Sequence, residues 1–114
     1  MTDPTDDLAL EVSHGDRNDL PLVIVAASGE IDTANNHRLE QLLVSIADDG
    51  RRDAVVVELG NVTFIDSSGL RALLTGQRAV VAAGRSFSIG DVSESVRRVL
   101  EITGLSDPLG LSGP

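Results

Sequence analysis

The segment whose residue types are best suited to chemistry is the polar connection Asp66-Ser67-Ser68-Gly69. It follows a Val-rich run and precedes an amphipathic one, so we expect it to join a buried strand to a helix N-terminus. Free backbone N–H groups at a helix start favour anions, and Asp or Ser side chains cap them. One cap needs one side chain, whereas this connection has three polar side chains and a glycine. Since function gathers at strand C-terminal ends in parallel α/β sheets, we expect more than capping here.

Few other residues offer catalytic or metal-binding chemistry. The chain has no Cys and no Lys, which excludes disulfides, thiolates, Schiff bases and the Walker-type phosphate lysine. His14 and His37 stand far apart without a further ligand at metal-binding spacing, so no metal and no cofactor is expected. No G-x-S-x-G elbow is present. A small hydrolase with Ser68 as nucleophile stays open as an alternative, although neither His is placed by the sequence to serve as its base.

Composition narrows the partners. The 114 residues include 18 Asp and Glu against nine basic residues, all Arg, for a net charge of -9. Such a chain repels phosphate backbones, and two Phe with no Trp or Tyr give no stacking platform, so no nucleic acid is expected as a partner. The first residues lack signal-peptide features, and no apolar run approaches the ~20 residues that span a bilayer. We expect a cytoplasmic protein without membrane contact.

The elements that position the polar connection follow from hydrophobic periodicity, which switches between 2 and 3.6 and predicts the order β-β-α-β-α-β-α. We expect strands over about 8–13, 22–27, 54–59 and 86–89, and helices over about 39–47, 67–83 and 93–103. Residues 14–19 supply a turn between the first two strands, which form an antiparallel hairpin, while helical crossovers make the later strands parallel. The fold class is therefore α/β, with a small mixed sheet of about four strands and three to four packed helices.

Three finer predictions concern helices and chain ends. The second helix should bury Leu70, Leu73, Leu74 and Val81, and Gly76 within it indicates close packing. Asp32 is suited to act as N-cap of the first helix. One domain over residues 8–105 is expected, with a disordered tail over 1–7 and a loosely ordered, turn-rich tail over 106–114.

The run from Val62 to Leu70, VTFIDSSGL, resembles the phosphorylation-site motif of bacterial anti-sigma factor antagonists, members of the STAS domain family. Gly29-Glu30-Ile31-Asp32 resembles the family's other signature, and the expected element order agrees over about residues 8–105. The resemblance implies a STAS-like fold and a regulatory switch without catalysis. The unphosphorylated antagonist would bind an anti-sigma factor that is a serine kinase and thereby free the sigma factor. Phosphorylation would end binding, and a PP2C-type phosphatase would reset the switch.

Carried over residue by residue, the resemblance makes Ser68 the phosphoacceptor. Asp66, Ser67 and Gly69 form its immediate environment, and Asp32 helps form the partner and phosphotransfer site. The chain departs from the family pattern at residues 35–38, Asn-Asn-His-Arg, which are more polar than the Thr, Ala and Pro expected there. An alternative keeps the fold but makes the chain a non-enzymatic STAS module of a larger signalling or transport assembly, binding a small ligand or structural partner.

Overall fold

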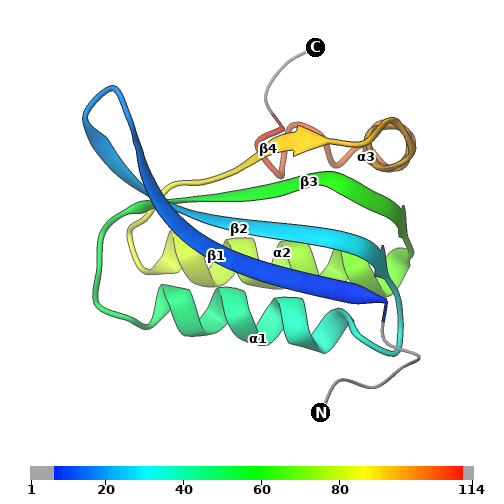
Figure 1. Cartoon of the computed structure of the whole chain (residues 1–114), viewed down its shortest axis with the longest axis horizontal. Helices are drawn as coiled ribbons and strands as arrows, with labels where there is room; N and C mark the ends of the chain where they lie inside the picture. The colour runs from blue at the N-terminus through cyan, green and yellow to red at the C-terminus, as the bar shows by residue number, and fades with distance from the viewer. Residues whose placement is uncertain (1–6, 112–114) are drawn as a thin grey trace.

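The element order of the computed structural model, which describes residues 7–111, is the expected one (Figure 1). Its strands are β1 (Leu8–Arg17), β2 (Leu20–Ile31), β3 (Ala54–Ile65) and β4 (Phe87–Val92), and its helices are α1 (Asn36–Ala47), α2 (Ser67–Ala82) and α3 (Glu94–Thr103). The sheet order is β1-β2-β3-β4. β1 is antiparallel to β2, and the other two pairs are parallel, so the mixed α/β sheet with an N-terminal hairpin is confirmed.

The hairpin between β1 and β2 is longer than the sequence predicted. Residues 14–19 were expected as a turn, but β1 continues to Arg17, which pairs with Leu20. The turn is only Asn18 and Asp19, whose φ angles are +53° and +67°. Positive φ at both central residues defines a type I′ turn, and Asn and Asp tolerate this conformation better than most residues. The outer end of the hairpin is exposed on both faces, so no hydrophobic alternation marks it.

β2 and β3 also extend beyond their predicted ends, and this extension creates the site. They were expected to stop at Ala27 and Leu59 but reach Ile31 and Ile65, through register irregularities after Ala26 and Gly29 in β2. The polar and glycine residues that suggested a strand end are tolerated because the ladder shifts there instead of breaking. As a result the C-terminal ends of two parallel strands lie side by side, and each is followed by a short connection and a helix (Figure 1).

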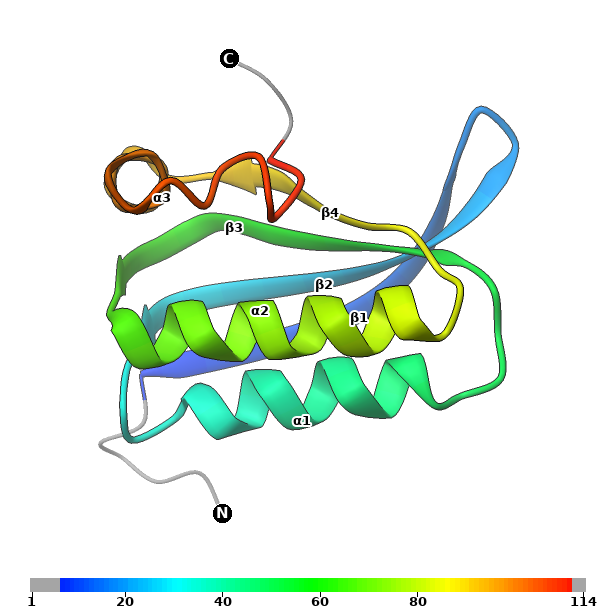
Figure 2. The ribbon, with the colours of Figure 1, turned by 180° about the vertical axis from the view of Figure 1, so that it is seen from behind.

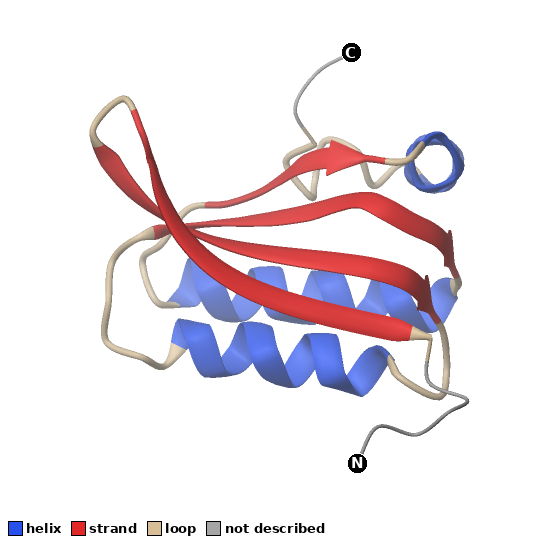
Figure 3. Ribbon diagram, in the orientation of Figure 1, coloured by secondary structure: helices blue, strands red, loops and turns tan. Residues whose placement is uncertain are grey.

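α1 and α2 cover one face of the sheet, while α3 lies beside the β4 edge (Figures 2 and 3). The core lies between these helices and the sheet, and its fully buried residues include Val25, Leu39, Val57 and Leu73. The predicted close packing at Gly76 is confirmed, because a Cβ at this position would overlap the Leu43 side chain of α1. The two helices are thereby held close enough to bring their N-termini together.

One predicted core residue of α2 is wrong. Val81 is 56% exposed, and Val80 is buried in its place, whereas Leu70 and Leu73 are buried and Leu74 is half-buried. Val80 lies four residues after Gly76 and seven after Leu73, so it shares their side of the helix. Val81 is turned by about 100° from that side, which follows from 3.6 residues per turn.

The chain ends differ from the expectation as far as they are described. Residues 106–111 form a hydrogen-bonded turn with Leu109 fully buried, and Leu111 forms a parallel bridge with Ile89 of β4. This part of the tail expected at 106–114 is therefore packed, because its leucines complete the core under β4. Of the tail expected at 1–7, residues 1–6 lie outside the described range, as do residues 112–114. Between residues 7 and 111, no helix has both the length and the apolar character needed to cross a bilayer.

Candidate functional site

The connection between β3 and α2, called here the second elbow (residues 65–69), is organised by one carboxylate. Asp66 has extended backbone angles and is the N-cap of α2, and its Oδ1 accepts a hydrogen bond from the Gly69 N–H at 3.0 Å. The same oxygen accepts the hydroxyl of Ser68 at 2.6 Å. The elbow thus caps the helix and also fixes a serine side chain, which is more than a single cap requires.

The charge of Asp66 is stabilised by these contacts. The hydrogen bond from Ser68 is the main cause that lowers the pKa of Asp66 below its ordinary value. Partial burial opposes this effect, while backbone N–H groups, including that of Gly69, reinforce it. Asp66 is consequently ionised at neutral pH and only accepts hydrogen bonds, so the Ser68 hydroxyl must be the donor.

Ser67 and Gly69 complete the second elbow in different ways. Ser67 is exposed, whereas Ser68 is half-buried. Gly69 is buried, and a Cβ there would lie only 2.7 Å from Ile65 Cγ1 and 2.8 Å from Ile31 Cγ2. Glycine therefore lets the start of α2 pack closely against Ile31 and Ile65. This packing fixes the position of Ser68 relative to the sheet.

The connection between β2 and α1, called here the first elbow (residues 29–36), is held by an asparagine. Asn35 is 3% exposed, donates its amide to the Glu30 carbonyl at 2.9 Å and accepts the Asp32 N–H at 2.9 Å. It is the N-cap residue of α1, yet its side chain makes no capping bond. The prediction that Asp32 caps α1 is wrong, because α1 begins four residues later and Asp32 Oδ1 instead accepts the Ala34 N–H at 3.0 Å.

The two elbows are joined at the phosphoacceptor predicted from the sequence. The Asp66 N–H donates to the Ile31 carbonyl at 3.2 Å, which links the strand ends. The Asn36 amide donates to the Asp32 carbonyl at 2.9 Å and lies 3.3 Å from Ser68 Oγ. Asn36 therefore connects the backbone carbonyl of Asp32 to the Ser68 hydroxyl. The carboxylate of Asp32 is bound instead to the backbone N–H of Ala34.

Asn36 is a site residue that sequence reasoning missed. It lies in the polar run at residues 35–38, which was treated as a departure from the family pattern with no assigned role. The usable signal was topological, because neighbouring parallel strands deliver the helices that follow them to the same edge of the sheet. A polar side chain in the first turn of α1 is then positioned to meet one in the first turn of α2.

Comparisons with known proteins give one matching family model and several relatives. The family model described as "STAS domain" matches residues 9–112. An "Anti-sigma-B factor antagonist" of Staphylococcus aureus (strain NCTC 8325 / PS 47) is 36% identical over 83 residues, which are 73% of this chain and 76% of that protein. A protein with the same name from Staphylococcus epidermidis shows the same identity and coverage.

Solved structures extend the likeness to the whole fold. The crystal structure of an anti-sigma factor antagonist from Mycobacterium paratuberculosis superposes with a TM-score of 0.78 at 25% identity, covering 100% of this chain and 92% of that one. The Bacillus cell fate determinant SpoIIAA in its phosphorylated form has a TM-score of 0.67 at 20% identity and 92% coverage of both chains. This second likeness establishes a shared fold, which in SpoIIAA accommodates a phosphorylated state.

Proposed function

The chain belongs to the STAS domain family, and on that premise we propose that it is an anti-sigma factor antagonist controlled by phosphorylation of Ser68. In the unphosphorylated state it binds an anti-sigma factor that is a serine kinase, and the sigma factor is released. A PP2C-type phosphatase restores the binding form. The chain has no catalytic activity of its own and acts in the cytoplasm, where sigma factors act.

The observation that carries this proposal is the position of Ser68. Its Oγ stands at the start of α2, held at 2.6 Å by Asp66 and lying 3.3 Å from the amide of Asn36. These two contacts orient the hydroxyl, and the serine is only half-buried, which supports access by a second protein. Ser67, which is exposed, and Gly69, which is buried, are its neighbours in the chain. In this proposal, Asp32 and Asp66 are the acidic residues of the surface around Ser68 that contacts the kinase.

The chemistry of the transfer also divides between the two proteins. Ser68 Oγ attacks the γ-phosphorus of ATP held by the kinase, an O–P bond forms, and the bond to the ADP oxygen breaks. The hydroxyl proton must leave to a base. Because the pKa of Asp66 is lowered, this carboxylate orients the hydroxyl but is a weak base, so the kinase must supply the acceptor.

Phosphorylation acts on the partner interface more than on the fold. A phosphoserine adds about -1.5 to -2 charges at pH 7, close to the Asp66 carboxylate, and the helix N-terminus partly offsets this charge. The hydrogen bond from Ser68 to Asp66 is lost, because a phosphate ester has no hydroxyl proton to donate at that oxygen. A loss of 3 kcal/mol at the interface would weaken binding about 150-fold, which is sufficient for a switch.

The test is phosphorylation by purified kinase-type anti-sigma factors from the source genome with ATP, followed by mass spectrometry. We expect one phosphate on Ser68 and none in Ser68→Ala. The matched control is Ser67→Ala, which changes the exposed neighbour and should be phosphorylated normally. Binding measured by calorimetry should be lost after phosphorylation. If no candidate binds or phosphorylates the chain, the proposal fails in favour of a ligand-binding STAS module.

A further inference from the structure

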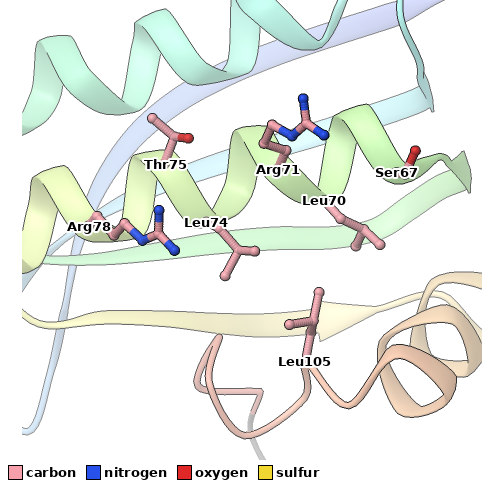
Figure 4. A pocket seen from close by; sticks show the side chains of 7 residues that line it. All are labelled: Ser67, Leu70, Arg71, Leu74, Thr75, Arg78 and Leu105. Atoms are coloured by element: carbon pink, nitrogen blue, oxygen red, sulfur yellow. The ribbon is translucent and has the colours of Figure 1, made fainter.

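A solvent-open groove of about 500 Å³ begins at Ser67 and runs along the outer side of α2 (Figure 4). Leu70 and Leu74 of α2 face Leu105, which follows α3, so the floor of the groove is apolar. The side chain of Gln77 donates to the Pro108 carbonyl and thereby fastens the far wall to the helix. The groove is therefore a formed feature between two anchored segments.

The charge of this groove is opposite to that of the chain as a whole. α2 contains two arginines and no acidic residue, although the complete chain has a net charge of -9. Arg71 and Arg78 both line the groove, both are exposed, and neither forms an ion pair with any residue in the described range 7–111. No acidic residue is among the described residues that line the groove, and Asp107, two residues after Leu105, forms no ion pair with either arginine.

The groove continues toward the C-terminal end of α2. A second hollow shares Arg78 and is also lined by Gln77 and Val81, the valine that is 56% exposed. From Ser67 to Val81 the helix rises by about 20 Å, since each residue adds about 1.5 Å. The exposed side of α2 is thus a stripe with alternating apolar and cationic positions, of a length that matches about four turns of a second helix.

We propose, on the basis of the proposed function, that this groove binds an acidic amphipathic segment of the anti-sigma factor. Leucine-like side chains of the segment pack on Leu70, Leu74 and Leu105, and its carboxylates pair with Arg71 and Arg78. Charge complementarity selects such a segment. A second copy of this chain is disfavoured, because two chains of net charge -9 repel each other.

Arg71 links this groove to the phosphorylation switch. Ser68 and Arg71 are three residues apart on α2, so they are neighbours on the helix surface. A phosphate on Ser68 can therefore pair with the Arg71 guanidinium and take it from the carboxylate of the partner. Phosphorylation then weakens docking through competition within the chain, in addition to repulsion at the interface.

The experiment measures affinity for the anti-sigma factor that binds wild type in the preceding assay. Arg78→Glu should weaken binding of the unphosphorylated chain about tenfold or more, and binding of the wild-type chain should weaken as salt is raised. Arg17→Glu makes the same charge change at the tip of the hairpin and should leave affinity within about twofold. In Arg71→Gln, phosphorylation of Ser68 should reduce affinity by a clearly smaller factor than in wild type.

Other outcomes decide against the groove. If Arg78→Glu binds like Arg17→Glu while the Ser68 switch persists, the groove proposal is overturned and the proposed function stands. If sedimentation shows that wild type self-associates and Arg78→Glu does not, the groove is instead an interface between copies.

If no anti-sigma factor binds wild type, the proposed function fails and a direct probe decides about the groove. The probe is a synthetic helical peptide of about 14 residues with leucine and glutamate at i, i+4 spacing, titrated into the ¹⁵N-labelled chain. Saturable shifts of α2 amides that disappear in Arg78→Glu would support the groove as an acidic-segment site. Their absence would overturn it.

Discussion

The two elbows occupy equivalent places, at the ends of neighbouring parallel strands, but use their polar side chains differently. In the first elbow Asn35 is buried, and its side-chain amide bonds to backbone groups of Glu30 and Asp32. In the second elbow Asp66 is half-buried and bonds to a helix N–H and to a serine hydroxyl. The first elbow is therefore a structural brace, whereas the second holds the hydroxyl of Ser68, the residue proposed for phosphorylation. On this proposal, adjacent turns divide structural support from function.

The largest effect should come from the glycine of the first elbow. Gly29 has a φ of +99°, and a Cβ there would collide with the backbone carbonyl of Asp7. Gly29→Ala should lower the free energy of unfolding by about 3 kcal/mol or more, combining left-handed strain with a backbone overlap. Urea denaturation measures it. Gly50→Ala is the control, because Gly50 has a φ of +80° with no atom within 4 Å of a Cβ, and should cost only about 1 kcal/mol.

The brace itself should rank second. Asn35→Ala removes a buried amide and leaves the Glu30 carbonyl and the Asp32 N–H without their partner. We expect a loss of about 2 kcal/mol in the free energy of unfolding, since each buried polar group left unpaired costs about 1–3 kcal/mol. Ser68 phosphorylation by the kinase should survive at temperatures where the variant is folded. A loss of phosphorylation without a loss of stability would break the proposed division between the elbows.

Asp66→Ala should destabilise less than Asn35→Ala and disturb function more. It removes the cap of α2, worth about 1 kcal/mol, and water can replace part of the lost bonding at a half-buried position. It also frees the Ser68 rotamer, so the rate of phosphorylation should fall at least about tenfold. Parallel unfolding and kinase assays on the two alanine variants provide the comparison. Equal kinase rates in both would contradict it.

The smallest expected effect is on how the stability of the fold depends on pH, through the carboxylate of Asp66. The pKa of Asp66 is lowered chiefly by the hydrogen bond from Ser68, so its carboxylate stabilises the fold above its unfolded pKa. This contribution is lost as pH falls through the lower, folded pKa. Ser68→Ala should raise the pKa of Asp66 in the folded protein, as carboxyl NMR titration would show. The pH range between the unfolded and the folded pKa of Asp66, over which this stabilisation is lost, should then become narrower. Ser67→Ala should leave the titration unchanged, and a shift there would mean that the hydroxyl of the wrong serine had been assigned.

Much of the fold could be predicted from the sequence because hydrophobic periodicity is strong in its core elements. The helices around Leu39 and Leu73 and the parallel order of the later strands followed from spacing alone. The strand ends were missed because β2 and β3 cross polar residues by shifting register, which composition does not reveal. Val81 was placed in the core because hydrophobicity does not distinguish it from Val80, and only the side of α2 that faces the core, shared by Leu73, Gly76 and Val80, decides between them.

In the candidate site, the sequence indicated residues 66–69 but neither Asn36 nor the hydrogen bonds that join these residues. The types and order of residues 66–69 indicated a capped helix with more polar groups than a cap requires. In the structure, Asp66 accepts hydrogen bonds from both the Gly69 N–H and the Ser68 hydroxyl. The contact between Asn36 and Ser68 joins residues 32 apart in the sequence, so no local pattern indicated it, and only the parallel order of β2 and β3 pointed to it. Similarly, nothing local announces that Arg85 is buried, with its guanidinium bound to the carbonyls of Asp53 and Ile46.

The bridge between Ile89 and Leu111 has a consequence for handling the protein. Uncovered edge strands invite pairing between molecules and hence aggregation. Here the turn at residues 106–111 shields the β4 edge and keeps Leu109 from solvent, while the opposite edge, β1, bears Glu11 and Asp16. An expression fragment trimmed to the end of α3 would retain both elbows and Ser68. It would nevertheless leave the edge of β4 uncovered and prone to aggregation, so we expect that residues after Thr103 are required for a soluble, monodisperse sample.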